Sequence, residues 1–281
     1  MDIIFHETET EVRTADFDLD KTFNCGQCFR WRPEEGAARS YIGVAYGRAA
    51  RARQIGESVF ISGGRGEFES LWRDYFDLGR DYAAIRAALS VDPYMARAAE
   101  HGAGIRILRQ EPWEALCTFI ISQCNNIPRI TQIVEALCRL FGAPVQFEGR
   151  TLYAFPAPET LAALREEDLA PLRCGYRARY IIGAARAVAE GRIDLEKLKD
   201  APERDAVVSL KALDGVGDKV AHCAALFGLG KLNAFPVDTW MKKALESQYG
   251  GRADVSRFAP YAGIAQQYIF HYARSSARPA S

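Results

Sequence analysis

The stretch that decides the fold is LDGVGDKVAHCAALFGLGKLNAFPVDTW, residues 213–240. Glycine is the usual residue where a helix stops in a left-handed turn, so the helix before this stretch is expected to end at Gly215. Gly217 is expected to adopt a second unusual backbone angle before a new helix begins at about Asp218. The stretch therefore predicts a helix, a tight hairpin and a second helix within residues 206–228.

The hairpin has the properties of an anion site. The backbone amides of Gly215, Val216 and Gly217, with those of the new helix's first turn, are expected to point outward together and to suit a DNA phosphate. Backbone amides can bind a phosphate without a net positive charge on the protein. The chain has no net charge, because its 36 Lys and Arg balance 36 Asp and Glu. Any contact with DNA is therefore expected to be local.

Two side chains in the stretch add possible chemistry. Lys219 lies in the first turn of the second helix, where its amine is a candidate nucleophile; a phosphate contact or an exposed salt bridge is its alternative role. Asp238 precedes the helical stripe that starts at Met241, so it is expected to cap that helix. A capping carboxylate is rigid and ionised, which also suits it to stabilise a cationic sugar as a glycosidic bond breaks.

Composition sets the class of protein. At 281 residues and 48% hydrophobic, the chain can bury two cores. It has no apolar run long enough for a membrane span and no signal-peptide pattern, so we expect the cytosol, or the nucleus in a eukaryote. The seven cysteines are expected to be reduced thiols. Cys25 and Cys28 form the one C-x-x-C motif, and without a second pair or a nearby histidine we expect no metal there.

Two hydrophobic periods divide the chain. Up to about residue 80 it has strand-like runs separated by turn residues, with strands expected at 29–32, 41–46 and 59–61. From about residue 83 the apolar positions recur at helical spacing. The stripes begin at Trp113, Ile130, Ile181, Val220, Met241 and Tyr261. We therefore predict an α+β fold with a small antiparallel sheet domain over residues 1–95 and a mainly helical region over residues 96–281.

Four further segments carry a family resemblance, in order along the chain. They are NCGQCFRW at 24–31, FIISQCNNIPRI at 119–130, GYRARY at 175–180, and the run at 260–270. Together with the hairpin they resemble the helix-hairpin-helix DNA glycosylases, and among these the bifunctional 8-oxoguanine DNA glycosylase/AP lyases. The resemblance implies a TBP-like sheet domain followed by a helical HhH-GPD body.

The resemblance also implies a reaction. The damaged base is flipped out of duplex DNA, because its glycosidic bond cannot be reached inside the stack. Lys219 attacks the sugar C1′, the base leaves, and the resulting imine permits strand cleavage by β-elimination, while Asp238 steadies the developing positive charge. No metal or other cofactor is needed. The expected partner is double-stranded DNA that contains oxidised guanine, and we expect a monomer.

Recognition of the damaged base carries over by position. Gly26 is expected to offer its backbone carbonyl to the N7 hydrogen that distinguishes 8-oxoguanine from guanine. Gln266 is expected to bond the Watson-Crick edge, and Phe270 and Cys223 are expected to sandwich the purine. Taken without the family, Phe270 and Cys223 lie on apolar helix faces and read as core packing.

The opposite strand is expected to be read by a second group. The resemblance assigns Arg129 and Arg177 to the orphaned cytosine, with Asn125 beside them, and Tyr176 to a wedge in the duplex. On their residue types alone, Arg177 and the neighbouring arginines form a basic patch suited to the DNA backbone.

Three positions depart from the family pattern. Cys124 replaces an asparagine that fills the gap left by the flipped base, which puts the strength of cytosine preference in question. Trp240 replaces a histidine, and Asp214 replaces a proline.

Three other functions are compatible with parts of the sequence. A relative with an iron-sulfur cluster needs four closely spaced cysteines near the C-terminus, and none follows Cys223. An alkyl-base glycosylase would keep Asp238 without needing Lys219. A noncatalytic DNA-binding module would explain the hairpin glycines alone.

Overall fold

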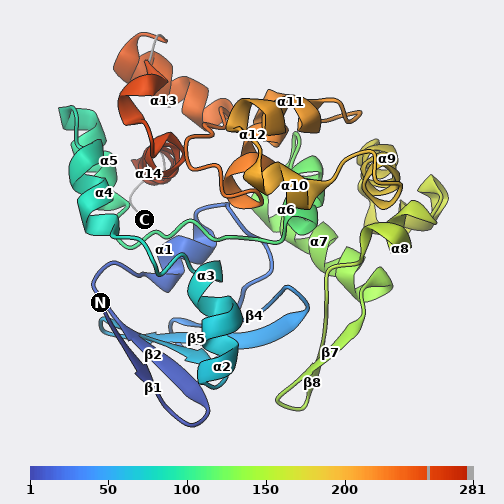
Figure 1. Cartoon of the computed structure of the whole chain (residues 1–281), viewed down its shortest axis with the longest axis horizontal. Helices are drawn as coiled ribbons and strands as arrows, with labels where there is room; N and C mark the ends of the chain where they lie inside the picture. Colours follow the sequence, from blue (N-terminus) through green and yellow to red (C-terminus); the bar gives the residue numbers. More distant parts are fainter. Residues whose placement is uncertain (252–253, 277–281) are drawn as a thin grey trace.

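A six-stranded antiparallel sheet forms the N-terminal part of the protein, in the order β1-β2-β6-β5-β4-β3. The computed structural model describes residues 1–251 and 254–276. The strands of the sheet are β1 (Asp2–Phe5), β2 (Glu9–Arg13), β3 (Arg32–Pro33), β4 (Ser40–Ala45), β5 (Arg48–Ile55) and β6 (Ser58–Ser62). In Figure 1 this sheet lies below a body made mainly of helices.

The helical segments begin within the sheet domain and continue to the end of the described chain. They are α1 (Leu19–Asn24), α2 (Arg65–Glu67), the π-helix η1 (Phe68–Trp72), α3 (Arg73–Tyr75), α4 (Tyr82–Leu89), α5 (Pro93–His101), α6 (Pro112–Ile121), α7 (Ile127–Phe141), α8 (Pro158–Ala162), the 3-10 helix η2 (Glu166–Leu172), α9 (Arg177–Ala189), α10 (Leu195–Asp200), α11 (Glu203–Lys211), α12 (Asp218–Phe227), α13 (Thr239–Tyr249), the 3-10 helix η3 (Val255–Phe258) and α14 (Ala262–Ser276). No helix among the described residues has the length and apolar character that a membrane crossing requires.

The sheet is built from tight hairpins. Strands β4 and β5 pair from Ala45 and Arg48 outward, so only Tyr46 and Gly47 form the turn. Both have positive φ angles, 52° and 70°, as a two-residue turn of type I′ requires. The strand expected at 41–46 is thus confirmed within one residue as β4, and that expected at 59–61 lies within β6.

The other strand prediction and the strand-like reading up to residue 80 need correction. The run at 29–32 contributes only Arg32 to β3, because Phe29 turns into the helical core and Trp31 into the sheet core. Residues 65–75 are helical. The apolar side chains that they place on the sheet are Phe68, Trp72 and Tyr75, followed by Phe76. Their spacing of four, seven and eight residues is that of one helix face, a signal the aromatic content had masked.

Two hydrophobic cores follow the two parts of the chain. The sheet core ends at Leu78 apart from Leu108, whereas α4 and α5 bury Tyr82, Leu89 and Met95 in the helical core. The cores therefore change over near residue 80, and the division at residue 95 stays a prediction. The helical stripes predicted from residue 113 onward are confirmed as the buried faces of α6, α7, α9, α12, α13 and α14.

The C-x-x-C pair belongs to this division into two cores. Cys25 packs in the helical core and Cys28 in the sheet core. Burial raises the pKa of the Cys25 thiol to about 12 and that of Cys28 well above its ordinary value. Such thiols stay protonated, so the motif joins the two parts by packing.

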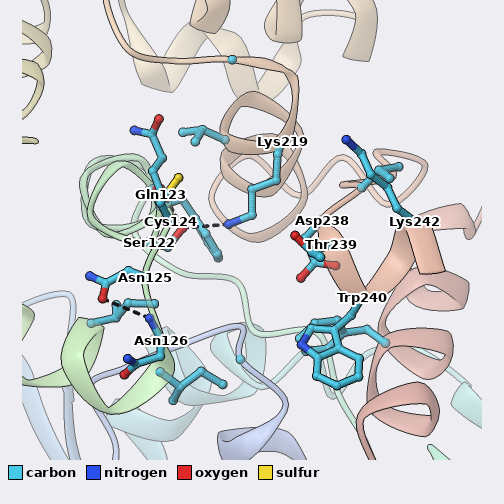
Figure 2. Close-up of a pocket in the computed structure, with 18 of the residues that line it drawn as sticks. Ser122, Gln123, Cys124, Asn125, Asn126, Lys219, Asp238, Thr239, Trp240 and Lys242 are labelled. Carbon is cyan, nitrogen blue, oxygen red and sulfur yellow. Dashed lines mark hydrogen bonds between the residues drawn. The ribbon is translucent and has the colours of Figure 1, made fainter. Parts of the chain in front are cut away.

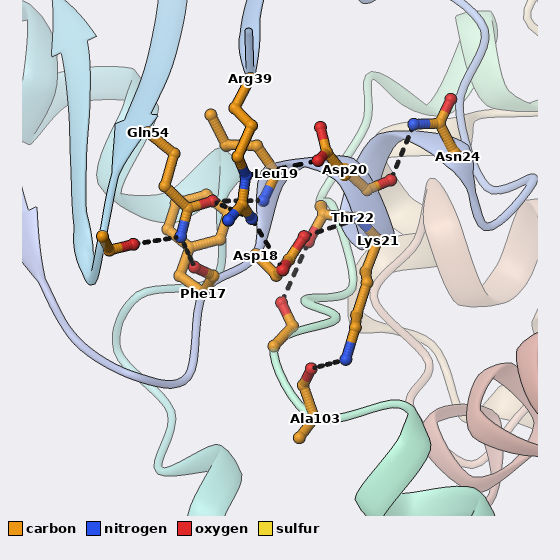
Figure 3. A network of polar contacts seen from close by, with 12 residues as sticks. Phe17, Asp18, Leu19, Asp20, Lys21, Thr22, Asn24, Arg39, Gln54 and Ala103 are labelled. Atoms are coloured by element: carbon orange, nitrogen blue, oxygen red, sulfur yellow. Dashed lines mark hydrogen bonds and ion pairs between the residues drawn. The ribbon is translucent and has the colours of Figure 1, made fainter.

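A polar network fixes the segment that leads to Gly26 (Figure 3). Lys21, in α1, donates to the carbonyls of His101 and Ala103, both at 2.9 Å. Asp18 caps α1 and pairs with Arg39 at 2.7 Å. Helix α1, which leads to Gly26, is consequently held by Arg39 at its start and by the end of α5 and the residue after it through Lys21.

A small hairpin interrupts the helical region. Strands β7 (Pro144–Phe147) and β8 (Arg150–Tyr153) form a two-stranded sheet that the sequence analysis did not predict. Figure 1 shows the hairpin reaching from the helical body toward the six-stranded sheet. Arg51 of β5 pairs with Glu148 at its tip, 2.5 Å apart, and so links the two sheets.

Candidate active site

A pocket of about 950 Å³ opens between the hairpin, the loop between α6 and α7, the start of α13 and helix α14. Figure 2 shows Lys219 and Asp238 pointing into this space from two different helices. The residues that line it also include Gly26, Ile127 and Phe270. The fold therefore brings together residues that lie more than 240 positions apart in the sequence.

Two neighbouring side chains contact the Lys219 amine. It lies in the first turn of α12, and its Nζ donates to Oγ of Ser122 at 2.7 Å. The ring of Phe119 lies below the amine, with its centroid 5.1 Å from Nζ. This ring and the serine fix the amine at the pocket wall.

Asp238 caps α13 as predicted. Its Oδ1 accepts from the backbone N–H of Met241 at 2.8 Å, which fixes the carboxylate at the pocket edge. Cys223 lies within the electrostatic reach of both charged groups: burial raises the pKa of its thiol to about 11, the charge of Lys219 opposes this shift, and that of Asp238 adds to it. The charges of Lys219 and Asp238 thus both reach the Cys223 thiol.

The hairpin joins two helices as predicted, but α11 ends at Lys211 and not at Gly215, so the turn that precedes α12 is longer than expected. Gly215 has a φ of +77°, and a Cβ there would lie 2.4 Å from the ring of Tyr180, so only glycine fits. Gly217 instead has φ −86° and ψ −177°, extended backbone that any residue adopts. The second unusual angle predicted there is wrong, and a Cβ on Gly217 would meet no atom within 4 Å.

The hairpin amides are not all available. Val216 donates its N–H to the carbonyl of Leu213 at 3.1 Å, inside the turn. The helix start at Asp218 is confirmed, so α12 directs its N-terminal amides toward the same face. Phosphate binding by Gly215 and Gly217 stays a prediction, and the geometry does not favour the Val216 amide for it.

Of the four residues expected to contact the damaged base, two line the pocket and two do not. Gly26 and Phe270 line it, with Gly26 at a φ of +82°. Cys223 and Gln266 are buried, and neither lies among the lining residues. Gln266 accepts a hydrogen bond at Oε1 from Gln267 at 2.8 Å. A direct contact of Gln266 or Cys223 with the base stays a prediction.

The loop of Gly26 is set by its buried neighbour Gln27. The Gln27 side chain donates to the carbonyls of Thr22 and Arg106 at 2.9 and 2.7 Å, and accepts from the N–H of Leu108 at 2.9 Å. All of these groups are buried, so Gln27 fixes the adjacent glycine in its left-handed conformation. The sequence analysis assigned no role to Gln27.

A second, smaller pocket of about 360 Å³ adjoins the first. It is lined by Cys124, Asn125, Asn126, Arg129 and Arg177. These include both arginines and the asparagine expected to read the opposite base. Cys124 and Asn125 line both pockets, so the loop that they form separates the two.

The two arginines differ in environment. Arg177 is buried, and its Nε donates to the carbonyl of Gln123 at 2.9 Å and its Nη2 to that of Cys124 at 3.2 Å. Arg129 is exposed and donates to the carbonyl of Arg173 at 3.0 Å. Arg177 therefore also holds the loop that carries the second pocket.

Two other predicted residues lie nearby. Asn125 turns back on its own loop, because its Nδ2 donates to the carbonyl of Ile121 at 3.2 Å. Tyr176 is 48% exposed just before α9, with its ring against Tyr180 and beneath the guanidinium of Arg177. An exposed ring held by two neighbouring side chains has the rigidity that a wedge requires.

Ser122 was missed by the sequence analysis, although it contacts the candidate nucleophile. It lies 97 positions from Lys219, and no local pattern marks such a contact. Trp240 and Lys242 also line the large pocket (Figure 2). Over the described part of the chain no group of three or more His, Cys, Asp or Glu side chains could hold a metal ion.

Both parts of the chain match families of known proteins. Residues 10–116 match the family model of the 8-oxoguanine DNA glycosylase N-terminal domain, and residues 117–257 match that of the HhH-GPD superfamily of base excision DNA repair proteins. An N-glycosylase/DNA lyase of Arabidopsis thaliana is 32% identical over 91% of this chain and 77% of its own length.

Two solved structures are similar over almost the whole chain. The structure of MBOgg1 with a low-affinity DNA ligand has 41% identity and a TM-score of 0.93, covering 99% of this chain and 100% of that one. The Clostridium acetobutylicum 8-oxoguanine glycosylase/lyase, bound to DNA with cytosine opposite 8-oxoguanine, has 38% identity, a TM-score of 0.92 and 99% coverage of both chains.

Proposed function

The chain belongs to the HhH-GPD superfamily of base excision DNA repair proteins, and from this premise we propose that it excises 8-oxoguanine from duplex DNA and then cleaves the strand. One observation carries the proposal: an amine, Lys219, and a carboxylate, Asp238, enter one pocket that Gly26 and Phe270 also line. An amine nucleophile is what allows one site to combine base removal with strand cleavage. The similarity to N-glycosylase/DNA lyases supports the same pair of activities.

The first step is displacement of the base. The lone pair of Lys219 Nζ forms a bond to C1′ of the flipped nucleotide, and the bond from C1′ to the purine breaks, with its electron pair leaving on the base. Positive charge develops on the sugar in this step. Asp238, fixed by its hydrogen bond to the Met241 amide, stabilises that charge without itself forming a bond.

The second step opens the sugar and the strand. The adduct's nitrogen loses one proton; the bond from C1′ to the ring oxygen then breaks with its electron pair on that oxygen, which takes up a proton to become a hydroxyl, and a protonated imine to Lys219 remains. Loss of a C2′ proton then expels the 3′ phosphate by β-elimination. The imine acts as the electron sink, so no metal is required for this route.

The residues around the two pockets are proposed to select the substrate. Gly26 and Phe270 receive the damaged base in the large pocket. Arg129 and Arg177 meet the opposite base at the smaller one, and Tyr176 fills the duplex between them. Location in the cytosol or nucleus, and a monomeric state, stay predictions.

Borohydride trapping tests the proposal, because it reduces the imine to a stable covalent adduct. Wild-type protein is expected to be trapped on a duplex with 8-oxoguanine and not on the same duplex with guanine. Lys219→Gln is expected to lose the adduct, whereas Lys242→Gln, which changes another lysine at the same pocket, is expected to retain it. An undiminished adduct in Lys219→Gln would contradict the assignment of the nucleophile.

The same assay separates the alternative functions. An alkyl-base glycosylase would excise a methylated purine, with no adduct and no dependence on Lys219. A noncatalytic module would bind the duplex and leave it intact.

A further inference from the structure

Ser122 accepts a hydrogen bond from the Lys219 amine. It ends α6, where its N–H donates to the carbonyl of Thr118 at 2.9 Å. Its hydroxyl donates to the carbonyl of Phe119 at 2.8 Å and accepts from Lys219 Nζ at 2.7 Å. A serine hydroxyl can donate one hydrogen bond, and here it donates that bond to the Phe119 carbonyl. Toward Lys219 the oxygen therefore acts only as an acceptor.

This arrangement restricts the attacking form of the amine. Neutral Lys219 has two N–H bonds and one lone pair. One N–H directed at Ser122 fixes the rotation about the bond from Cε to Nζ, which confines the lone pair to the remaining directions. The Phe119 ring, 5.1 Å from Nζ, limits movement on another side. Fixing the nucleophile before the substrate enters lowers the entropy cost of reaction.

Ser122 is itself rigid enough for this task. It is half-buried at the pocket wall. The carbonyl of the next residue, Gln123, accepts from Arg177 Nε at 2.9 Å, and that of Cys124 accepts from Arg177 Nη2 at 3.2 Å. The helix end before Ser122 and the arginine behind the loop thus hold it from two sides.

We propose that Ser122 is a positioning residue for Lys219 in both chemical steps, an inference that rests on the proposed function. Ser122 touches neither base nor sugar in this scheme; it acts only through the amine. Its loss therefore slows attack by Lys219 on any C1′, whether or not a base is still attached, and leaves DNA binding unchanged. A role in base recognition or in folding would give a different pattern.

The experiment compares wild type, Ser122→Ala, Ser122→Thr and Lys219→Gln. Single-turnover excision is measured with excess protein on an 8-oxoguanine duplex paired with cytosine, and trapping is measured on a duplex with a preformed abasic site. Duplex affinity and melting temperature are measured for each variant. Ser122→Ala is expected to slow excision and abasic-site trapping by about tenfold each, the effect of one lost hydrogen bond of ordinary strength. Ser122→Thr, which retains the hydroxyl, is expected to recover most of the rate.

The outcomes are distinguishable. Wild-type rates in a folded Ser122→Ala overturn the inference while the Lys219 adduct preserves the proposed function. Slower excision with normal abasic-site trapping, or with weaker duplex binding of matching size, also overturns it. If Ser122→Ala does not fold, Ser122→Cys replaces it, because a thiol has nearly the same shape but is a weak acceptor. An adduct absent from wild type overturns the proposed function and this inference together.

Discussion

The ring of Phe270 lies 3.4 Å from the position that a Cβ on Gly26 would occupy. The same Cβ would lie 3.4 Å from Cδ1 of Ile127, and the backbone of Gly26 has a φ of +82°. A side chain there would be strained and would narrow the space proposed for the damaged base. This single position therefore combines a backbone requirement with a requirement of the site.

Gly26→Ala is expected to separate these two effects when compared with Gly36→Ala. Gly36 has a similar φ, +77°, and a Cβ there would meet nothing within 4 Å. Both variants are expected to lose about 1–2 kcal/mol of unfolding free energy, measured by urea denaturation. Only Gly26→Ala is expected to slow excision of 8-oxoguanine, by at least about tenfold. Equal excision by the two variants would contradict the place of Gly26 in the base pocket.

Asp238→Asn is expected to remove charge and retain the cap. Asparagine caps a helix about as well as aspartate, so the hydrogen bond to Met241 and the melting temperature are expected to change little. Excision is expected to slow by about 100-fold, because the positive charge on the sugar loses its counterion. Asp194→Asn makes the same change at the cap of α10, where Asp194 accepts from the N–H of Lys197 at 3.1 Å. It is expected to excise normally, and an equal slowing in both variants would refute the role of the Asp238 charge.

The local part of the hairpin was predictable from sequence, and the contacts between segments were not. The helix start at Asp218 follows from rules that involve a few neighbouring residues, whereas α11 ends at Lys211, four residues before the end predicted at Gly215. The contact of Lys219 with Ser122 joins segments 97 positions apart. Nothing in the neighbourhood of either residue signals the other, so only the fold reveals it.

Two other predictions failed, one on the backbone of Gly217 and one on the hairpin of β7 and β8. Gly217 was expected to need its glycine for a backbone angle, yet its backbone is extended. Its open surroundings agree instead with close approach of another molecule, an explanation that depends on a partner outside the chain. Strands β7 and β8 were missed because they are short and lie within a region whose other apolar positions recur at helical spacing.

Substitutions of Arg177 and Arg129 are expected to differ in their effect on stability and to have the same effect on opposite-base preference. Arg177 is buried, and Arg177→Gln removes its charged hydrogen bonds to the carbonyls of Gln123 and Cys124, so a loss of about 2–4 kcal/mol in unfolding free energy is expected. Arg129→Gln changes an exposed side chain and is expected to alter stability by less than about 0.5 kcal/mol. Both are expected to reduce the ratio of excision rates with cytosine and with adenine opposite the lesion. A ratio unaffected by Arg129→Gln would remove that residue from opposite-base reading.

His271, on the inner side of α14, is expected to make the protein sensitive to acid. Burial, aided by the nearby positive charges of His101 and Lys21, lowers the pKa of His271 from its ordinary 6.5 to about 4. Between these values the unfolded chain binds a proton that the folded protein does not. This contribution to stability is therefore present above pH 6.5 and is lost as the pH falls toward 4. Because the side chain is partly exposed, the loss is expected to be on the order of 1 kcal/mol.

His271→Gln is expected to flatten this dependence, since glutamine has no proton to gain. Urea unfolding at several pH values between 7 and 4.5 measures it, as the difference in unfolding free energy between wild type and variant. A wild-type slope in His271→Gln would mean that other groups, such as the buried carboxyl of Glu114, govern the response. Because burial raises the pKa of Glu114 to about 7, that carboxyl acts in the opposite direction and stabilises the fold as the pH falls. An unfolding free energy of His271→Gln that rises as the pH falls is therefore the result expected if Glu114 governs the remaining response.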